Sequence, residues 1–163
     1  MANHYDVAII GSGPGGYVSA IRCAQLGFKT VCIEKVADQK MASLGGTCLN
    51  VGCVPSKALL ESSLIFSNTS HHLKDHGIKV SEVSLDINAM HQRKDEIVLS
   101  LSKGVSGLFK LNKVDTIRGQ AYISDPNVLK IISEDSDSSI TAENIILATG
   151  SRPIELPDYP FDE

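Results

Sequence analysis

The sequence contains few of the residues that characterise several common protein classes, beginning with cysteine. Four cysteines are too few for a disulfide-stapled secreted fold of 163 residues, so a close pair favours catalysis or metal binding. The 15 lysine and arginine residues are outnumbered by 19 acidic residues, and the net charge of −4 argues against a nucleic-acid partner. The chain therefore suits a protein that handles small molecules.

Long apolar runs are also missing, and this bears on membrane attachment. No run approaches the ~20 residues that cross a bilayer, and the amino terminus lacks a basic stretch with a cleavage site. Tryptophan is absent, which excludes no function. With 42% hydrophobic and 21% charged residues, the chain can bury one ordinary core. We expect one domain without a membrane span or secretion signal.

The first 34 residues have the order of a βαβ unit. Residues 5–10 form a short apolar run, typical of a buried strand, and the glycine-rich residues 11–16 follow directly. Residues 17–26 carry a helical apolar stripe that ends at Gly27, and residues 30–33 predict a second buried strand. The crossover between two such strands is expected to be right-handed.

The glycine loop of this unit favours a dinucleotide site. Gly11-x-Gly13-x-x-Gly16 removes side chains that would keep a pyrophosphate from the backbone N–H groups at a helix start. Glu34 lies 21 residues after Gly13, where a carboxylate can accept hydrogen bonds from ribose hydroxyls. A negative charge at this position also disfavours binding of a ribose that carries a 2′-phosphate. The alternative is a cluster of turn glycines with an exposed glutamate. The motif alone does not choose between NAD and FAD.

Cys48 and Cys53 are separated by four residues and can plausibly close a disulfide. Gly52 permits a sharp bend beside the second sulfur, and Pro55 suits the first turn of a helix. Cys53 is then expected near a helix amino terminus, where the helix dipole stabilises a thiolate and lowers its pKa. Lys57, one turn later, could support that thiolate or meet an anionic cofactor.

Other interpretations of these residues stay open on spacing alone. The pair could be a structural disulfide or two buried inert cysteines, whereas a zinc site needs more ligands than two cysteines supply. Lys57 could instead form a surface pair with Glu61. Cys23 and Cys32 are most simply core residues.

The remaining chain predicts two long helices followed by short strands, and then a proline-rich end. The predicted helices span 55–72 and 87–111, and the predicted strands span 114–123, 128–132, 140–141 and 143–150. We expect the middle strands to form a small antiparallel meander. Residues 151–160 hold three prolines, so we divide the chain into a domain at 1–150 and a linker at 151–163.

The segment from Gly45 to Lys57 closely resembles the active-site segment of the pyridine nucleotide-disulfide oxidoreductases. The glycine loop and residues 148–153 resemble their flavin domain in order and spacing. Leu49 and the run at 56–60 are similar to dihydrolipoamide dehydrogenases, and mercuric reductase is the nearest rival. The resemblance covers essentially the whole chain.

This resemblance implies an α/β fold, a Rossmann-like FAD-binding domain with a parallel sheet and a small antiparallel β-meander. It implies FAD as the cofactor and assigns its contacts residue by residue. The implied contacts are Gly11, Ser12, Gly13, Pro14, Gly15 and Gly16 at the pyrophosphate, Glu34 and Lys35 at the adenosine ribose, Ala121 at the adenine, and Gly46, Thr47, Cys48, Cys53, Lys57, Thr149, Gly150 and Ser151 on the flavin side.

The resemblance also implies the chemistry and the partners. Cys48 would be the interchange thiol that attacks lipoamide, and Cys53 would form a charge-transfer pair with oxidised flavin. Electrons would pass from dihydrolipoamide on a lipoyl carrier domain, through FAD, to NAD⁺, in a homodimer serving a 2-oxo acid dehydrogenase complex. The family's NAD site and its histidine–glutamate base lie in domains outside this sequence, so we expect the 163-residue chain alone to be inactive.

Two further expectations complete the interpretation. The compartment would be the bacterial cytoplasm or, alternatively, the mitochondrial matrix. The alternative function is an FAD- or adenosine-binding module without turnover, or part of a mercuric reductase-like enzyme. His91 and Glu96 imitate the spacing of the family's base pair, but they lie in an amphipathic helical pattern and are assigned a solvated helix face.

Overall fold

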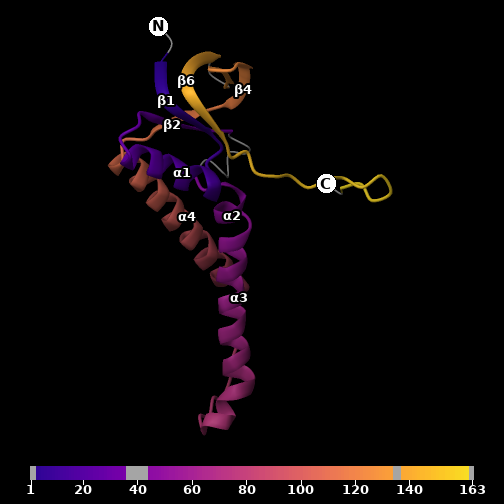
Figure 1. The fold of residues 1–163 in the computed structure, drawn as a ribbon. Coiled ribbons are helices and arrows are strands. Elements are labelled where there is room, and N and C mark those ends of the chain that lie inside the picture. The colour runs from indigo at the N-terminus through magenta and orange to yellow at the C-terminus, as the bar shows by residue number, and fades with distance from the viewer. Residues whose placement is uncertain (1–2, 36–43, 134–136, 162–163) are drawn as a thin grey trace.

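The computed structural model describes residues 3–35, 44–133 and 137–161, which fold around one six-stranded sheet (Figure 1). Its strand order is β3-β2-β1-β6-β5-β4. Neighbours among β1, β2, β3 and β6 pair in parallel, whereas β5 pairs antiparallel with both β6 and β4. The strands span Asn3–Ile10 (β1), Thr30–Glu34 (β2), Asp115–Arg118 (β3), Gln120–Asp125 (β4), Val128–Ile132 (β5) and Ser138–Leu147 (β6).

Among the described residues, four α-helices accompany the sheet. They are α1 (Pro14–Gln25), α2 (Gly46–Asn50), α3 (Cys53–Ser67) and α4 (Ile87–Leu111), and α3 continues into a π-helical turn (Asn68–His72) and a 3-10 turn (Leu73–His76). In Figure 1, α3 extends away from the sheet, whereas α4 meets α3 at an angle and runs obliquely beneath α1. Arg93 of α4 links them, because its guanidinium donates to the Ala58 carbonyl of α3 at 3.3 Å.

Alternation along β1 and β2 builds a core on each face of the sheet. Val7, Ile9 and Cys32 face one cluster, where Phe109 of α4 and Ala20 of α1 cover them. Their neighbours face the second cluster, which consists of strand residues only: Tyr5, Ala8, Val31, Ile33, Leu129, Ile131, Ile140 and Ala142. Burying each large apolar side chain stabilises the fold by roughly 1.5–3 kcal/mol. The carboxyl ends of β1 and β2 are thereby held by packing on both sides.

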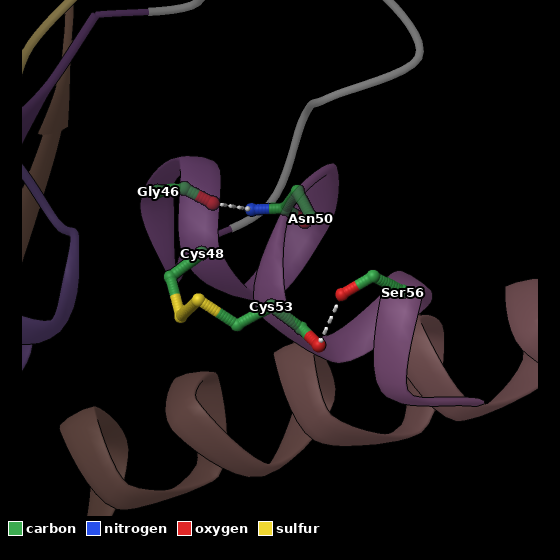
Figure 2. Close-up of a disulfide and its surroundings, with 5 residues drawn as sticks. All are labelled: Gly46, Cys48, Asn50, Cys53 and Ser56. Atoms are coloured by element: carbon green, nitrogen blue, oxygen red, sulfur yellow. Dashed lines mark hydrogen bonds between the residues drawn. A yellow bond between two sulfur atoms is a disulfide. The ribbon is translucent and has the colours of Figure 1, made fainter. Parts of the chain in front are cut away.

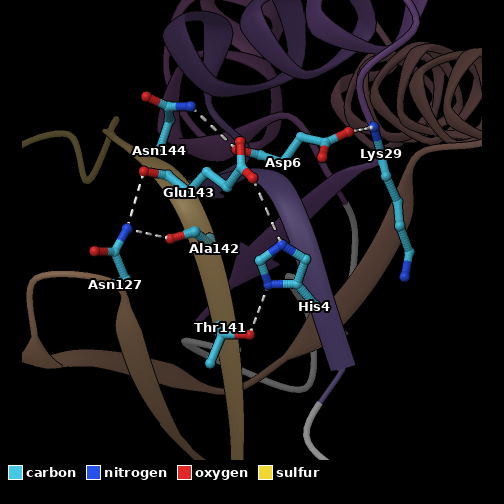
Figure 3. A network of polar contacts seen from close by, with 8 residues as sticks. All are labelled: His4, Asp6, Lys29, Asn127, Thr141, Ala142, Glu143 and Asn144. Carbon is cyan, nitrogen blue, oxygen red and sulfur yellow. Dashed lines mark hydrogen bonds and ion pairs between the residues drawn. The ribbon is translucent and has the colours of Figure 1, made fainter.

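Polar contacts tie the amino-terminal part of β1 to β6 (Figure 3). His4 Nδ1 lies 2.9 Å from the Thr141 hydroxyl, and Asn144 donates its amide to the Asp6 carbonyl at 3.3 Å. The Asp6 carboxylate accepts the Lys29 backbone N–H at 2.6 Å, which also anchors the chain entering β2. These contacts lie toward the start of β1, whereas the glycine loop follows its end.

The prediction for the second long helix is confirmed, because α4 has the predicted bounds of 87–111. The first helix was predicted at 17–26 and begins three residues earlier, at Pro14. The helix predicted at 55–72 begins at Cys53, and its last turn, 68–72, is π-helical. The pentapeptide α2 was not predicted, because five residues are too short to show a period.

Three of the predicted strands were wrong in their boundaries. Residues 114–123 form two strands, of which β3 joins the parallel sheet beside β2 and only β4 belongs to the meander. Gly119 separates them at φ +149°, and an added Cβ there would lie 2.6 Å from Ile131 Cγ2. The strands predicted at 140–141 and 143–150 are one strand, β6, whose residues 138–141 pair with β5 and whose residues 140–147 pair with β1.

Residues 151–161 leave the sheet as an exposed segment with an isolated bridge between Leu156 and Tyr159. Figure 1 shows this segment extending away from the rest of the fold. The division into a domain ending at 150 and a linker stays a prediction. Within the described ranges, no helix has the length and apolar character needed to span a membrane.

Candidate functional site

The glycine loop connects β1 to α1 through two close backbone approaches. Gly11 adopts φ +103°, and a Cβ on it would lie 2.3 Å from the Ala148 carbonyl oxygen. A Cβ on Gly16 would lie 1.8 Å from the Gly11 carbonyl oxygen. These two glycines are therefore required by the packing of the loop against β6 and against itself.

Gly13 differs from these two, because the protein itself leaves space in front of it. A Cβ on Gly13 would meet nothing closer than 3.9 Å, the distance to the Gly46 Cα. Its φ is −65°, which any residue adopts, and it caps α1 without a side-chain hydrogen bond. The open approach to a helix start is what an anion needs in order to reach backbone N–H groups.

The redox segment packs directly on this loop. Gly46 has φ +60°, and a Cβ on it would lie 2.6 Å from the Gly13 Cα. The Gly45 N–H donates to the Ser12 carbonyl at 3.0 Å. The first residues of α2 are thus held against the glycine loop by backbone contacts that a side chain would prevent.

Glu34 at the end of β2 is joined to the glycine loop through Ser12. The Glu34 Oε2 atom accepts the Ser12 N–H at 2.6 Å and also accepts the Ser12 hydroxyl. Ser12 is fully buried, at 0% exposure. Hydrogen bonds to an ionised carboxylate are among the stronger ones in proteins, so this contact sets the direction of the glutamate.

A pocket of about 220 Å³ opens at the carboxyl ends of β1, β2 and β6. Five residues predicted as cofactor contacts line it: Gly11, Glu34, Lys35, Ala121 and Thr149. Ligands of open α/β sheets bind at this edge of the sheet. Residues far apart in the chain, from the loop to the end of β6, are therefore brought to one place.

Four lining residues were not predicted from the sequence. Ile10 and Ile33 are the last apolar residues of β1 and β2, and Gly119 and Gln120 form the junction between β3 and β4. The glycine at 119, inside a strand-like run, was the one available signal, because a strand glycine often marks a close approach of backbone or ligand. The isoleucines carried no signal beyond burial.

Cys48 and Cys53 form a disulfide with a Cα–Cα distance of 4.7 Å (Figure 2). Cys48 lies in α2, and Cys53 begins α3, as predicted from Pro55. Gly52 turns the chain between them, and a Cβ there would lie 3.2 Å from the Thr47 carbonyl. Asn50 donates to the Gly46 carbonyl at 2.9 Å, and the Ser56 hydroxyl donates to the Cys53 carbonyl at 3.1 Å.

The disulfide is accessible rather than part of the core. Cys53 is exposed and Cys48 is partly exposed, whereas Leu49 between them is buried at 7%. Lys57 is exposed one turn further along α3, and the structure records no ion pair between Lys57 and Glu61, both of which it describes. The alternative of two buried inert cysteines does not fit this placement.

The other predicted site residues lie around these two features. Pro14 and Gly15 form the exposed first turn of α1, and Thr47 lies in α2 beside Cys48. Gly150 and Ser151 follow β6 and are exposed, two and three residues after Ala148. The structure records no contact that tests the predicted roles of these residues.

The remaining cysteines and the histidine–glutamate spacing lie elsewhere. Cys23 and Cys32 are free thiols. Cys32 is buried in β2, and burial, with the nearby charge of Glu34 as a lesser cause, raises the pKa of its thiol to about 12. His91 is exposed on α4, and Glu96 accepts the Gln92 amide at 2.9 Å, as expected of a solvated helix face.

A second pocket lies at the far end of α3. Its volume is about 300 Å³, and it is lined by Leu73, Ile78 and Val80 among other residues. None of the predicted site residues lines it. Among the described residues, no group of three or more histidine, cysteine, aspartate or glutamate side chains could hold a metal ion.

Comparison with known proteins gives consistent relatives. The chain is 48% identical to a mitochondrial dihydrolipoyl dehydrogenase of Pisum sativum and 47% identical to a dihydrolipoyl dehydrogenase of Bacillus subtilis. It is 46% identical to a leghemoglobin reductase of Vigna unguiculata. Each match covers 97% of this chain but 29–32% of the relative, so the chain spans about a third of their length.

Solved structures with the same fold are flavoprotein disulfide reductases. The Cu(II) complex of the HOCl-induced flavoprotein disulfide reductase RclA from Escherichia coli superposes with a TM-score of 0.77 at 27% identity, covering 95% of this chain and 30% of that one. The same protein in a structure described without copper gives a TM-score of 0.74.

The family profile described as pyridine nucleotide-disulphide oxidoreductase matches residues 5–161, which is nearly the whole chain. This family combines the features found in the structure: a glycine loop after the first strand of an α/β sheet, and a cysteine pair able to form a disulfide beside it. The chain belongs to the pyridine nucleotide-disulphide oxidoreductase family.

Proposed function

We propose that the chain is the FAD-binding, redox-disulfide part of a dihydrolipoyl dehydrogenase. In this role, the Cys48–Cys53 disulfide oxidises dihydrolipoamide to lipoamide, and the electrons pass by way of FAD to NAD⁺. The observation that supports it most is the placement of this disulfide at the start of α3, on a segment packed against the glycine loop.

The residues present fit FAD, the cofactor that the family implies. The open space in front of Gly13, at the start of α1, suits the pyrophosphate, and Glu34 in the pocket suits ribose hydroxyls. The flavin side would be met by Gly46, Thr47, Lys57 and residues 149–151. FAD supplies two-electron transfer between a dithiol pair and NAD⁺ when bound.

The chain's own residues perform the thiol exchange. A dihydrolipoamide thiolate attacks Cys48 Sγ, so that a mixed disulfide forms and Cys53 Sγ leaves as a thiolate. The second dihydrolipoamide thiolate then attacks the lipoyl sulfur of the mixed disulfide, which releases lipoamide and the Cys48 thiolate. Cys53 begins α3, where the positive end of the helix dipole stabilises the thiolate that forms.

The partners follow from the relatives rather than from this chain. Dihydrolipoyl dehydrogenases imply a role in 2-oxo acid dehydrogenase complexes, with the substrate carried on a lipoyl domain. We further propose a homodimer in the full-length protein, with the NAD site and the histidine–glutamate base outside these residues. The relatives include a mitochondrial protein and a bacterial one, in line with either the matrix or the cytoplasm.

Lipoamide-dependent reduction of NAD⁺ tests this function. In a polypeptide that continues past Glu163 over the length of the relatives, dihydrolipoamide should drive NADH formation, followed at 340 nm. Cys48→Ser and Cys53→Ser should each lower the rate by at least about a hundredfold, because neither variant can form the disulfide. Cys23→Ser, a free thiol on α1, is the matched control and should keep the wild-type rate.

Retention of that activity in Cys48→Ser would refute the assigned role of the pair. An assay with mercuric ion in place of lipoamide distinguishes the proposed enzyme from a mercuric reductase, because a mercuric reductase would oxidise NADPH when mercuric ion is present. Substantial mercury-dependent turnover without lipoamide turnover would replace the proposed substrate.

A second candidate function is an FAD- or adenosine-binding module without turnover. The pocket of about 220 Å³, lined by Glu34, Ala121 and Thr149, favours it because this pocket is already formed in the 163-residue chain. The purified chain should then bind flavin near a 1:1 ratio, measured by absorbance after desalting. Failure of added FAD to raise the melting temperature would count against it.

A further inference from the structure

Ser12 stands between the first two glycines of the Gly-x-Gly-x-x-Gly motif. Here it is one of three fully or nearly fully buried polar residues among those described, with Thr30 and Ser102. Its hydroxyl and its N–H both donate to the same Glu34 oxygen, Oε2. Two donors from one residue hold the carboxylate in one orientation.

The second Glu34 oxygen, Oε1, has no hydrogen-bond partner among the residues that the structure describes, and Glu34 lines the pocket. One oxygen is therefore used inside the protein, and the other is left for a ligand. A partly buried carboxylate fixed in this way would accept a hydrogen bond from a ribose hydroxyl and would repel a phosphate ester at the same position.

Ser12 also reaches the redox segment. The Gly45 N–H donates to the Ser12 carbonyl at 3.0 Å and lies 3.3 Å from its hydroxyl oxygen. The Ser12 hydroxyl can donate only one hydrogen, which goes to Glu34, so its lone pairs remain for Gly45. One side chain thus connects the end of β2, the glycine loop and the residue before α2.

We propose that Ser12 is a positioning residue that sets the nucleotide specificity of the site: by holding Glu34 Oε2, it keeps the carboxylate where it binds an unsubstituted ribose and rejects a 2′-phosphate. This inference rests on the proposed nucleotide site. Ser12 acts through Glu34 and the loop backbone rather than by touching the cofactor with its side chain, which is fully buried.

The test is a double-mutant cycle read by ligand affinity. The chain, freed of any bound flavin, is titrated calorimetrically with ADP, which represents the adenosine half of FAD, and with 2′-phospho-ADP. The proteins are wild type, Ser12→Ala, Glu34→Ala and the double variant. Ser102→Ala is the matched control, since it also removes a buried hydroxyl, but one that donates to the Leu44 carbonyl instead of to Glu34.

Ser12→Ala should weaken ADP binding roughly tenfold, and it should narrow the preference for ADP over 2′-phospho-ADP, because a charge-assisted hydrogen bond to Glu34 is lost. In the Glu34→Ala background, the same substitution should change ADP affinity by less than about twofold. Ser102→Ala should leave both the affinity and the preference unchanged. A loss of general packing would lower stability but would not alter this preference.

The inference would be overturned if Ser12→Ala changed ADP affinity equally with and without Glu34, or if it left the preference for ADP over 2′-phospho-ADP unchanged. A wild-type chain that binds no ADP would also overturn it. If Ser12→Ala does not fold, Ser12→Cys replaces it; this variant keeps a side chain of similar size but is a weaker donor to Glu34, and it must still narrow the preference. If the full-length protein turns over lipoamide but the effect of Ser12→Ala on ADP binding does not depend on Glu34, only this inference is refuted. If that dependence is found but turnover does not require Cys48, only the proposed substrate is refuted.

Discussion

At the scale of single residues, the three glycines of the Gly-x-Gly-x-x-Gly motif have two different roles. Gly11 and Gly16 are required by the protein, because a Cβ on either would overlap a carbonyl oxygen at 2.3 Å or less. Gly13 is not required in this way, because its nearest neighbour would lie at 3.9 Å. The motif thus combines glycines that permit the fold with one that leaves room for a ligand.

This division predicts opposite outcomes for two identical substitutions. Gly16→Ala should lower the free energy of unfolding by about 2–3 kcal/mol, because its Cβ forces the loop to shift. Gly13→Ala should change stability by under about 1 kcal/mol but should weaken FAD binding at least tenfold. Urea denaturation and flavin titration of both variants make the comparison. Loss of stability in Gly13→Ala equal to that in Gly16→Ala would contradict the assignment.

At the scale of elements, α4 packs against the sheet and contacts the residue before the redox segment. It contributes Val105 and Phe109 to the core under β1 and β2, and its Ser102 hydroxyl donates to the Leu44 carbonyl, just before the redox segment. Asp86 caps this helix, because its carboxylate accepts the N–H groups of Asn88 at 2.9 Å and Ala89 at 3.1 Å. The cap and the apolar stripe explain why its bounds could be predicted from the sequence.

Removing this cap should cost a measurable part of the stability. Asp86→Ala should lower the free energy of unfolding by about 1 kcal/mol, because two backbone N–H groups lose their acceptor. Asp86→Asn keeps an acceptor oxygen and should lose only a few tenths of a kcal/mol. Thermal and urea unfolding monitored by circular dichroism measure both. Equal losses in the two variants would assign the effect to charge rather than to the cap.

The elements that were mispredicted share a physical cause. Residues 114–123 are continuously strand-like, and β3 and β4 meet at Gly119, whose φ of +149° and close approach to Ile131 leave no room for a side chain. In β6, residues 138–141 pair with β5 and residues 140–147 pair with β1, so no local signal separates or joins the two predicted strands. These boundaries are decided by neighbours distant in sequence.

At the scale of the whole molecule, folding fixes the environment of groups that play no part in the proposed exchange. Cys32 lies at 0% exposure in β2, in contact with the cluster beneath α1 and α4. Burial is the larger cause that raises the pKa of its thiol, and the charge of Glu34 is the lesser one. The thiol is therefore held protonated in the folded state under conditions where an unfolded thiol ionises.

This difference predicts a loss of global stability at high pH. The pKa of Cys32 rises from 9.0 when unfolded to about 12 in the fold, so stability is unaffected below pH 9 and falls as the pH rises from there toward 12. The slope approaches about 1.4 kcal/mol per pH unit. Cys32→Val should remove this slope. Urea unfolding of both proteins between pH 8 and 10.5 measures it, and parallel curves would disprove the linkage.

Much of the site could be predicted from the sequence because its signals are local. Glycine spacing, Glu34 at the end of a strand, and Cys48 and Cys53 flanking a glycine before a helical proline are each readable within a few residues. The role of Ser12 could not be predicted, because nothing in its neighbours along the chain indicates that its hydroxyl meets a carboxylate 22 residues away.

The amino-acid sequence by itself determined the βαβ unit, the extent of α4 and the placement of the second cysteine near the amino terminus of α3, since each depends on periodicity, caps and turn residues close in the chain. Only the tertiary structure decided that Ala121 and Thr149 join Glu34 around one pocket, and that Gly46 lies on Gly13. Strand pairing and backbone packing between distant segments set these contacts, and no short stretch of sequence encodes which strands become neighbours.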